Sequence, residues 1–161
     1  MNTMLQITVI GFGATVIMDV YAWVLRLFGI KGLDYRFLGR WIGYLAQGKF
    51  FHHTILETPA IRYEKSIGQI AHYAIGIAFA YLLVLLFGVS WLDDPTPFPA
   101  WTVGVLTMLA PFLIMQPAFG FGIAGARLPN PQRARWMSLL IHGVYGSGLY
   151  LSAWFILQIR V

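Results

Sequence analysis

The chain has no cysteine and few charged residues. Without cysteine it can form no disulfide, use no thiolate nucleophile and bind no metal through thiolates. Charged residues make up 11% of the 161 residues, whereas hydrophobic residues make up 58%. This composition excludes an ordinary soluble domain and predicts an integral membrane protein. The net charge is +5, but the basic residues lie between apolar runs, so the expected partner is the lipid bilayer and not nucleic acid.

Familiar catalytic motifs are also lacking. The segment GFGIAG at 120–125 matches G-x-G-x-x-G, but a dinucleotide site needs a preceding strand, a following helix and an acidic residue about 20 positions later. There is no Walker A sequence, no G-x-S-x-G and no H-E-x-x-H. The sequence leaves enzymatic activity open and favours a role without catalysis.

Four apolar stretches are long enough to cross a bilayer, which takes about 20 residues per helix. They are 4–28, 66–88, 99–120 and 135–157. We therefore expect an all-α polytopic membrane protein, with four transmembrane helices in a bundle and one integral membrane domain over residues 1–161.

Lysine and arginine are concentrated in 29–65 and 121–134 and are absent from 89–98. Basic loops stay on the cytoplasmic side of a membrane. This pattern predicts that both basic loops are cytoplasmic and that both termini lie outside.

The first basic loop carries a helical pattern of its own. An apolar stripe runs through 37–45, Arg36 and Arg40 fall on another side, and Asp34 is suited to an N-cap. The pattern predicts a short amphipathic helix at the cytoplasmic membrane interface. A lid packed on the helix bundle is the alternative.

Polar residues inside the apolar spans are the candidate site. Small residues four positions away mark the faces where membrane helices meet, so these polar groups should point at other helices and not at lipid. The candidates for binding a ligand or proton are Thr15, Asp19, His72, Gln116, His142 and Tyr145. If the second span begins early, with Thr58 as N-cap and Pro59 in the first turn, Glu64 joins the same face as His72.

Two prolines interrupt the third span. Pro111 and Pro117 each remove an amide and free the carbonyl four residues earlier. The freed carbonyls indicate either a polar cavity beside Gln116 or a kink that improves packing.

Several segments together resemble a known family. These are GFGATVIMDVYAW, LGRWIGYLAQGKFFH, IGQIAHYAIGIAFAY, APFLIMQPAFGFGIAGARLPNP and LIHGVYGSGLY. They are similar to the small bacterial membrane proteins called domain of unknown function 2938. The resemblance implies a bacterial inner-membrane location but no reaction, and its recurring polar positions fall here on Asp19, His52, Glu64, His72, Gln116, Asn130 and His142.

Three hypotheses follow for the polar residues. They bind or translocate a proton, a cation or a small polar ligand, in a chain that forms a homo-oligomer. Alternatively, they are packing contacts of a structural or accessory subunit in a larger membrane complex. In the third hypothesis Asp19, His72, His142 and His52 hold a divalent metal, or His72 and His142 hold haem b.

Overall fold

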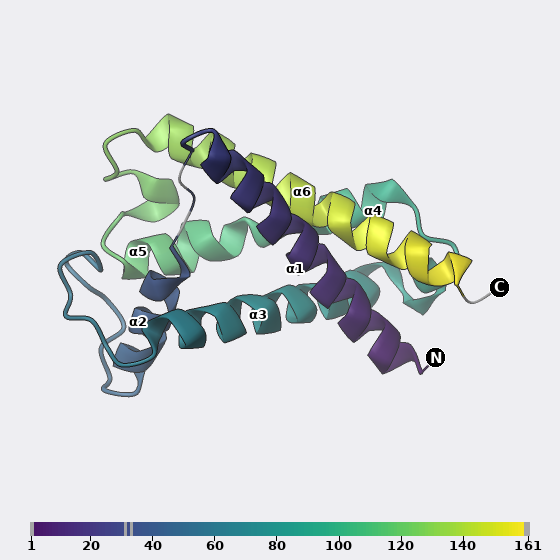
Figure 1. The fold of residues 1–161 in the computed structure, drawn as a ribbon, viewed down its shortest axis with the longest axis horizontal. Helices are drawn as coiled ribbons and strands as arrows, with labels where there is room; N and C mark the ends of the chain where they lie inside the picture. Colours follow the sequence, from purple (N-terminus) through teal and green to yellow (C-terminus); the bar gives the residue numbers. More distant parts are fainter. Residues whose placement is uncertain (1, 31, 33, 160–161) are drawn as a thin grey trace. The chain divides into compact units, whose positions relative to one another are not determined.

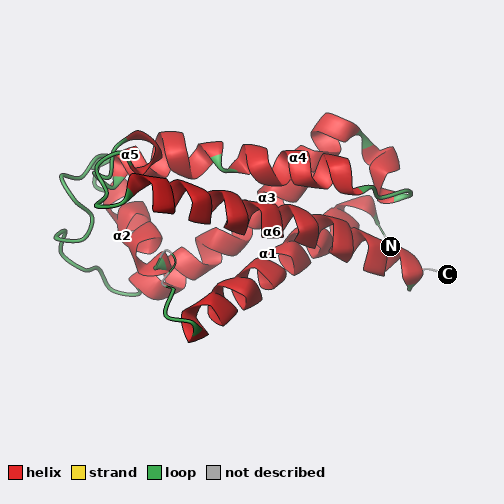
Figure 2. Cartoon of the chain, turned by 90° about the horizontal axis from the view of Figure 1, so that it is seen from above, coloured by secondary structure: helices red, strands yellow, loops and turns green. Residues whose placement is uncertain are grey.

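The computed structural model describes residues 2–30, 32 and 34–159. Within that part every regular element is helical and there is no strand (Figure 2), so the predicted all-α class is confirmed. The elements are α1 (Thr3–Leu27), α2 (Tyr35–Leu45), α3 (Glu64–Phe87), η1 (Val89–Leu92), α4 (Pro97–Thr107), η2 (Pro111–Met115), α5 (Gln116–Ala118), η3 (Ile123–Gly125) and α6 (Pro131–Gln158).

Four helical stretches are long and apolar enough to cross a membrane. They are α1, α3, the interrupted stretch Pro97–Ala118 and α6. The predicted limits of the first two spans agree with α1 and α3 to within two residues. Helix α6 begins at Pro131, where the Asn130 side chain accepts a hydrogen bond from the Arg133 amide at 3.1 Å.

The suggested early start of α3 at Thr58 and Pro59 is wrong, because the helix begins at Glu64. Tyr63, directly before it, has a φ of 64°, which breaks the helical path. The Thr58 hydroxyl donates to the Thr54 carbonyl at 2.9 Å instead of capping α3.

The third apolar stretch is interrupted, as its prolines predict. Helix α4 ends at Thr107, and Pro111 opens a π-helical turn, η2. In this turn the Gln116 amide donates to the carbonyl of Pro111, five residues earlier. Proline lacks the amide that an uninterrupted α-helix needs, and the wider turn accommodates that loss.

The chain divides into two compact units. The first comprises Met1–Gly32, Tyr73–Thr107 and Leu139–Val161, and the second comprises Leu33–His72 and Met108–Ser138. The division falls within α3 and α6, so each of these helices contributes one part to each unit.

In the first unit, helices meet through small residues. A Cβ added at Gly148 of α6 would lie 2.9 Å from the Ala14 Cα of α1, and Figures 1 and 2 show these helices side by side. A Cβ at Gly11 would lie 2.7 Å from the Ile77 Cα of α3, and one at Gly104 of α4 would lie 2.7 Å from a backbone carbon of α6. Such close approaches are typical of membrane helices.

In the second unit, α2 packs directly on the first turns of α3. A Cβ at Gly39 would collide with the Glu64 carbonyl, and one at Gly68 would collide with the Tyr35 carbonyl. Arg40 is buried at 7% exposure, so its predicted place away from the packed face is wrong. The two glycines let the backbones approach so closely that Arg40 reaches the start of α3, and this packing corresponds to the lid alternative.

The rest of the second unit is joined by backbone pairing. The His52 amide donates to the Ala118 carbonyl and the Ile55 amide to the Phe119 carbonyl, both at 2.9 Å. Ile55, Ala118 and Phe119 form the buried core beneath these bonds. The loop after α2 is therefore fixed against the end of α5.

Candidate functional site

Asp19 is the acidic residue within the apolar part of α1. Its carboxylate is half-buried and accepts a hydrogen bond from the Tyr73 hydroxyl of α3 at 3.1 Å. Tyr73 also stacks obliquely on Phe12, with ring centroids 5.0 Å apart. The carboxylate thus lies beside the phenol of Tyr73 within the first unit.

Thr15 lies one turn before Asp19 on α1, and both Thr15 and Tyr145 approach Gly76. Thr15 is fully buried, and its hydroxyl donates to the Gly11 carbonyl at 2.8 Å. The Tyr145 hydroxyl of α6 donates to the Gly76 carbonyl at 2.6 Å. A Cβ at Gly76 would overlap the Thr15 hydroxyl, so glycine is needed here for α1 and α3 to meet.

His142 of α6 contacts Thr107 at the end of α4, with 2.9 Å between Nδ1 and Oγ1. The Thr107 hydroxyl donates its hydrogen to the Gly104 carbonyl at 2.6 Å. Because a hydroxyl has one hydrogen, the imidazole Nδ1 is the donor in the contact with Thr107. The proline-interrupted stretch is thereby tied to α6 within the first unit.

His72 belongs to the second unit and pairs with Tyr35 at the start of α2. The Tyr35 hydroxyl lies 2.9 Å from Nε2, and the rings stack with centroids 4.1 Å apart. Sequence reasoning identified His72 but missed Tyr35, because a tyrosine at the start of an amphipathic helix is read as part of its apolar face.

Glu64 forms a buried ion pair with Arg40 in the second unit. Arg40 donates from Nε to Oε2 at 2.8 Å and from Nη2 to Oε1 at 3.0 Å. Nη1 donates to the carbonyls of Ile55 and Thr58 at 3.0 and 2.8 Å. The hydrogen bonds to Glu64 raise the pKa of Arg40 above its ordinary value. Glu64 is thus a structural partner of Arg40, a role that its spacing from His72 does not indicate.

His52 is buried in the same unit and donates from Nδ1 to the Thr58 hydroxyl at 3.0 Å, since that hydroxyl donates onward to Thr54. Its Nε2 is buried without a hydrogen-bond partner among the described residues. Burial lowers the pKa of His52, and nearby Lys49 acts in the same direction. The imidazole is therefore held neutral.

Gln116 follows the π-helical turn, in the second unit. Its Oε1 is buried and unpaired within the described part of the chain. It faces Gly125, where an added Cβ would lie 3.4 Å from that oxygen. The amide therefore points into the turn that follows α5.

Hydrogen-bonded pairs of candidate residues occur in each of the two units. In the first unit Asp19 pairs with Tyr73, His142 pairs with Thr107, and Tyr145 contacts the Gly76 carbonyl near Thr15. In the second unit Glu64 pairs with Arg40, His72 with Tyr35, and His52 with Thr58. Within residues 2–30, 32 and 34–159, no group of three or more histidine, aspartate or glutamate side chains is arranged to hold a metal ion.

Comparison with known proteins places most of the chain in one family. The family model described as Protein of unknown function (DUF2938) matches residues 8–156. No curated protein and no solved structure matches the chain.

Proposed function

Because the chain belongs to the family described as Protein of unknown function (DUF2938), whose description names no reaction, we propose a function from its own side chains. The protein is an integral protein of the bacterial inner membrane that translocates a proton or a small cation by binding and releasing it at Asp19. The observation that carries this proposal is the half-buried Asp19 carboxylate in an apolar helix, hydrogen-bonded by Tyr73.

The chemical argument rests on the cost of a carboxylate inside a membrane. An ionised aspartate at the centre of a membrane helix costs about 3 kcal/mol or more, and such residues typically mark ion or proton pathways. A contact that served only helix packing could be made by asparagine or serine at lower cost. Protonation or a bound cation neutralises the carboxylate, and the Tyr73 hydroxyl stabilises the charged form between binding events.

The surrounding helix surface supports exchange along the contact between α1 and α3. Toward the N-terminal end of α1, the Thr8 hydroxyl lies 3.1 Å from the Tyr81 hydroxyl. Thr15 lies between Thr8 and Asp19. Hydroxyl groups therefore recur along this contact, which is the route that we propose for exchange with Asp19.

The other polar pairs have packing roles in this proposal. The His142 imidazole ties α6 to Thr107, and the Tyr145 hydroxyl ties α6 to a carbonyl of α3. Each such bond in a membrane contributes about 0.6 to 2 kcal/mol. A metal site is not part of the proposal, since no group of three or more described histidine, aspartate or glutamate side chains is arranged to hold a metal ion.

The proposed orientation follows the charge distribution. Loops 29–65 and 121–134 are cytoplasmic and both chain ends lie outside. Because the chain has no cysteine, single cysteines at exposed Met4 and Leu56 can report this with a membrane-impermeant maleimide on intact cells whose outer membrane is permeabilised. Labelling of Leu56→Cys but not of Met4→Cys would show that the orientation is the reverse of the one proposed.

The test of the proposed activity is ion flux in proteoliposomes. A potassium gradient with valinomycin drives protons into the vesicles, where a trapped dye reports the internal pH. Uptake of tracer sodium is measured in parallel. We expect flux above that of empty vesicles, at least tenfold lower in Asp19→Asn and reduced in Tyr73→Phe. The control Asp34→Asn removes an acidic charge at the N-cap of α2 and should keep full flux.

The unfolding midpoint of each variant is also measured, so that loss of flux can be distinguished from loss of structure. A folded Asp19→Asn protein with unchanged proton and sodium flux would refute the proposal and leave Asp19 as a packing residue. Wild-type protein that carries neither ion above the level of empty vesicles would refute it as well.

A further inference from the structure

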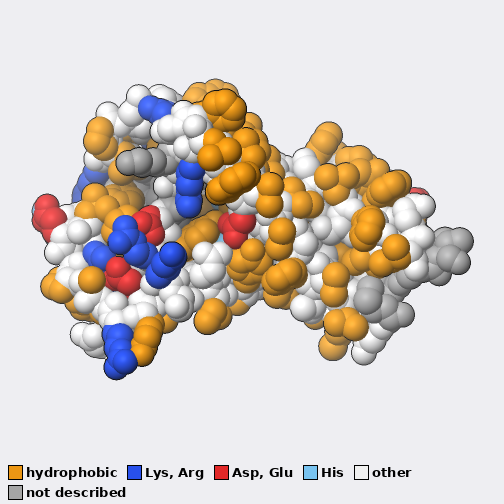
Figure 3. Space-filling view, viewed as in Figure 1, with side chains coloured by type: hydrophobic (Ala, Val, Ile, Leu, Met, Phe, Trp, Pro, Cys, Tyr) orange, Lys and Arg blue, Asp and Glu red, His pale blue; other side chains and the backbone are white. Residues whose placement is uncertain are grey.

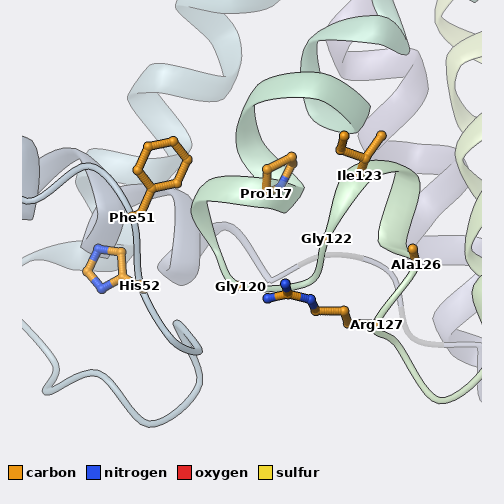
Figure 4. A pocket seen from close by; sticks show the side chains of 8 residues that line it. All are labelled: Phe51, His52, Pro117, Gly120, Gly122, Ile123, Ala126 and Arg127. Carbon is orange, nitrogen blue, oxygen red and sulfur yellow. The ribbon is translucent and has the colours of Figure 1, made fainter.

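A pocket of about 490 Å³ opens at the surface of the second unit (Figure 4). Its walls come from the loop after α2, from α5 and from the turn between α5 and α6, and they include Phe51, Pro117, Gly120, Gly122, Ile123 and Arg127. Asp19 and Tyr73, which are assigned above to ion binding, do not line this pocket.

The pocket combines apolar walls with one cationic group. Phe51 and Ile123 keep 66% and 64% of their surface exposed, and Pro117 adds a further apolar wall. The exposed Arg127 guanidinium makes no hydrogen bond or ion pair with the described residues. In Figure 4 the His52 ring lies on the other side of its backbone from Arg127, so His52 contributes a wall and not a second charge.

The backbone of the pocket is fixed before any ligand binds. Gly120 has a φ of 86°, and an added Cβ would collide with the His53 carbonyl. The Arg135 Nε donates to the Ala124 carbonyl at 3.0 Å, and the Arg127 amide donates to the Phe121 carbonyl at 2.8 Å. A preformed pocket loses little conformational entropy on binding.

Charge around the pocket favours an anion. The second unit contains eight of the eleven lysine and arginine residues but three acidic ones, namely Asp34, Glu57 and Glu64. Asp34 and Glu64 are neutralised by Arg36 and Arg40. Figure 3 shows several Lys and Arg side chains on one face of the molecule, with Asp and Glu side chains among them.

The place of the pocket in the chain indicates which anion. The turn that forms it joins the third and fourth candidate membrane spans, which end at Ala118 and begin at Pro131. If these helices cross a bilayer, as the proposed function holds, this turn lies at the level of the lipid headgroups. Exposed phenylalanine and isoleucine side chains beside an exposed arginine match a ligand that is apolar at one end and phosphate-bearing at the other.

We propose that this pocket binds an anionic phospholipid of the cytoplasmic leaflet, with its phosphate on Arg127 and the start of its acyl chains against Phe51 and Ile123. The inference rests on the proposed membrane location but not on ion binding at Asp19. Guanidinium groups suit phosphate because they present several N–H donors in one plane.

The test measures binding of phosphatidylglycerol and phosphatidylcholine to the protein in a neutral detergent, by native mass spectrometry at matched lipid concentrations. Detergent micelles remove the long-range attraction of an anionic membrane surface, so a local contact is measured. We expect phosphatidylglycerol to bind more tightly, and Arg127→Gln to weaken it about fivefold, the effect of one cationic group beside an anionic lipid. Phosphatidylcholine binding should fall less, because the choline cation offsets the charge of its phosphate.

Arg133→Gln is the matched control, because Arg133 is also exposed and basic and lies near the same turn but does not line the pocket. It should lower phosphatidylglycerol binding less than twofold. Equal losses in the two variants, or no preference between the lipids, would refute the proposal. Ile123→Ser should weaken both lipids alike through loss of apolar contact.

Two further measurements separate the sources of phosphate and the two proposals. If millimolar inorganic phosphate displaces the lipid from wild-type protein, the pocket is a free-phosphate site and the lipid assignment is wrong. Asp19→Asn should bind lipid normally, and Arg127→Gln should retain ion flux. Failure of ion flux with intact lipid selectivity would therefore overturn the Asp19 proposal alone.

Discussion

Breaking the buried Arg40–Glu64 pair should destabilise the protein more than any other single loss of charge. Both side chains are about nine-tenths buried, and Arg40 makes four hydrogen bonds. In Glu64→Gln the guanidinium keeps its charge and its two backbone carbonyls but loses the carboxylate. Removing one partner of a buried pair costs about 3 to 5 kcal/mol.

Arg40→Gln should cost a similar amount for the converse reason. Glu64 then keeps a hydrogen bond from the Ile61 amide at 3.2 Å and little else to offset its buried charge. The double variant has no buried charge, and its two amides can hydrogen-bond with each other. We therefore expect the double variant to be more stable, by about 2 to 3 kcal/mol, than the sum of the single losses predicts.

The assay is unfolding in detergent by added dodecyl sulfate, followed by circular dichroism for the wild type, both single variants and the double variant. Arg36→Gln is the control, since it removes the exposed ion pair with Asp34 and should not measurably change the midpoint. Single losses below about 1 kcal/mol, or losses that add to within about 0.5 kcal/mol, would show that this pair does not hold α2 on α3.

Two further predictions concern the same unit. Gly39→Ala and Gly68→Ala each place a methyl group against a backbone carbonyl and should lower the free energy of unfolding by about 1 to 3 kcal/mol. The control Gly143→Ala meets nothing within 4 Å and should be neutral or stabilising. Equal unfolding midpoints for all three variants would contradict this prediction. The lowered pKa of buried His52 means that its contribution to stability is complete above about pH 6.5 and is lost as pH falls through the folded-state pKa. The wild type should therefore be less stable to unfolding at pH 5 than at pH 7.5. This difference should disappear in His52→Gln and persist in His53→Gln, and a difference that persists in His52→Gln would disprove the assignment.

The features that the sequence predicted depend on short-range signals. The apolar spans follow from hydropathy alone. The start of α2 follows from Asp34, whose side chain accepts from the Arg36 amide at 3.0 Å. The prolines likewise predicted an interruption of the third apolar stretch, although they did not specify a π-helical turn.

The missed features depend on pairings between distant segments. Arg40 and Glu64 are 24 residues apart, and a periodic pattern assigns a face to a residue without naming its partner. The glycines beside them carried the available signal, because Gly39 and Gly68 mark the close approach of α2 to α3. Tyr73 was missed as the donor to Asp19 because its ring counts as apolar in any hydropathy pattern.

Many contacts that hold the second unit together have a backbone atom on one side. Arg40 donates to the carbonyl of Ile55, Arg135 to that of Ala124, and the His52 amide to that of Ala118. A substitution at Ile55 or Ala124 leaves the carbonyl in place as long as the backbone keeps its path. These positions can therefore change during evolution without a matching change at either arginine. Correlated substitutions among relatives would miss these contacts, although each of them joins two segments of the second unit.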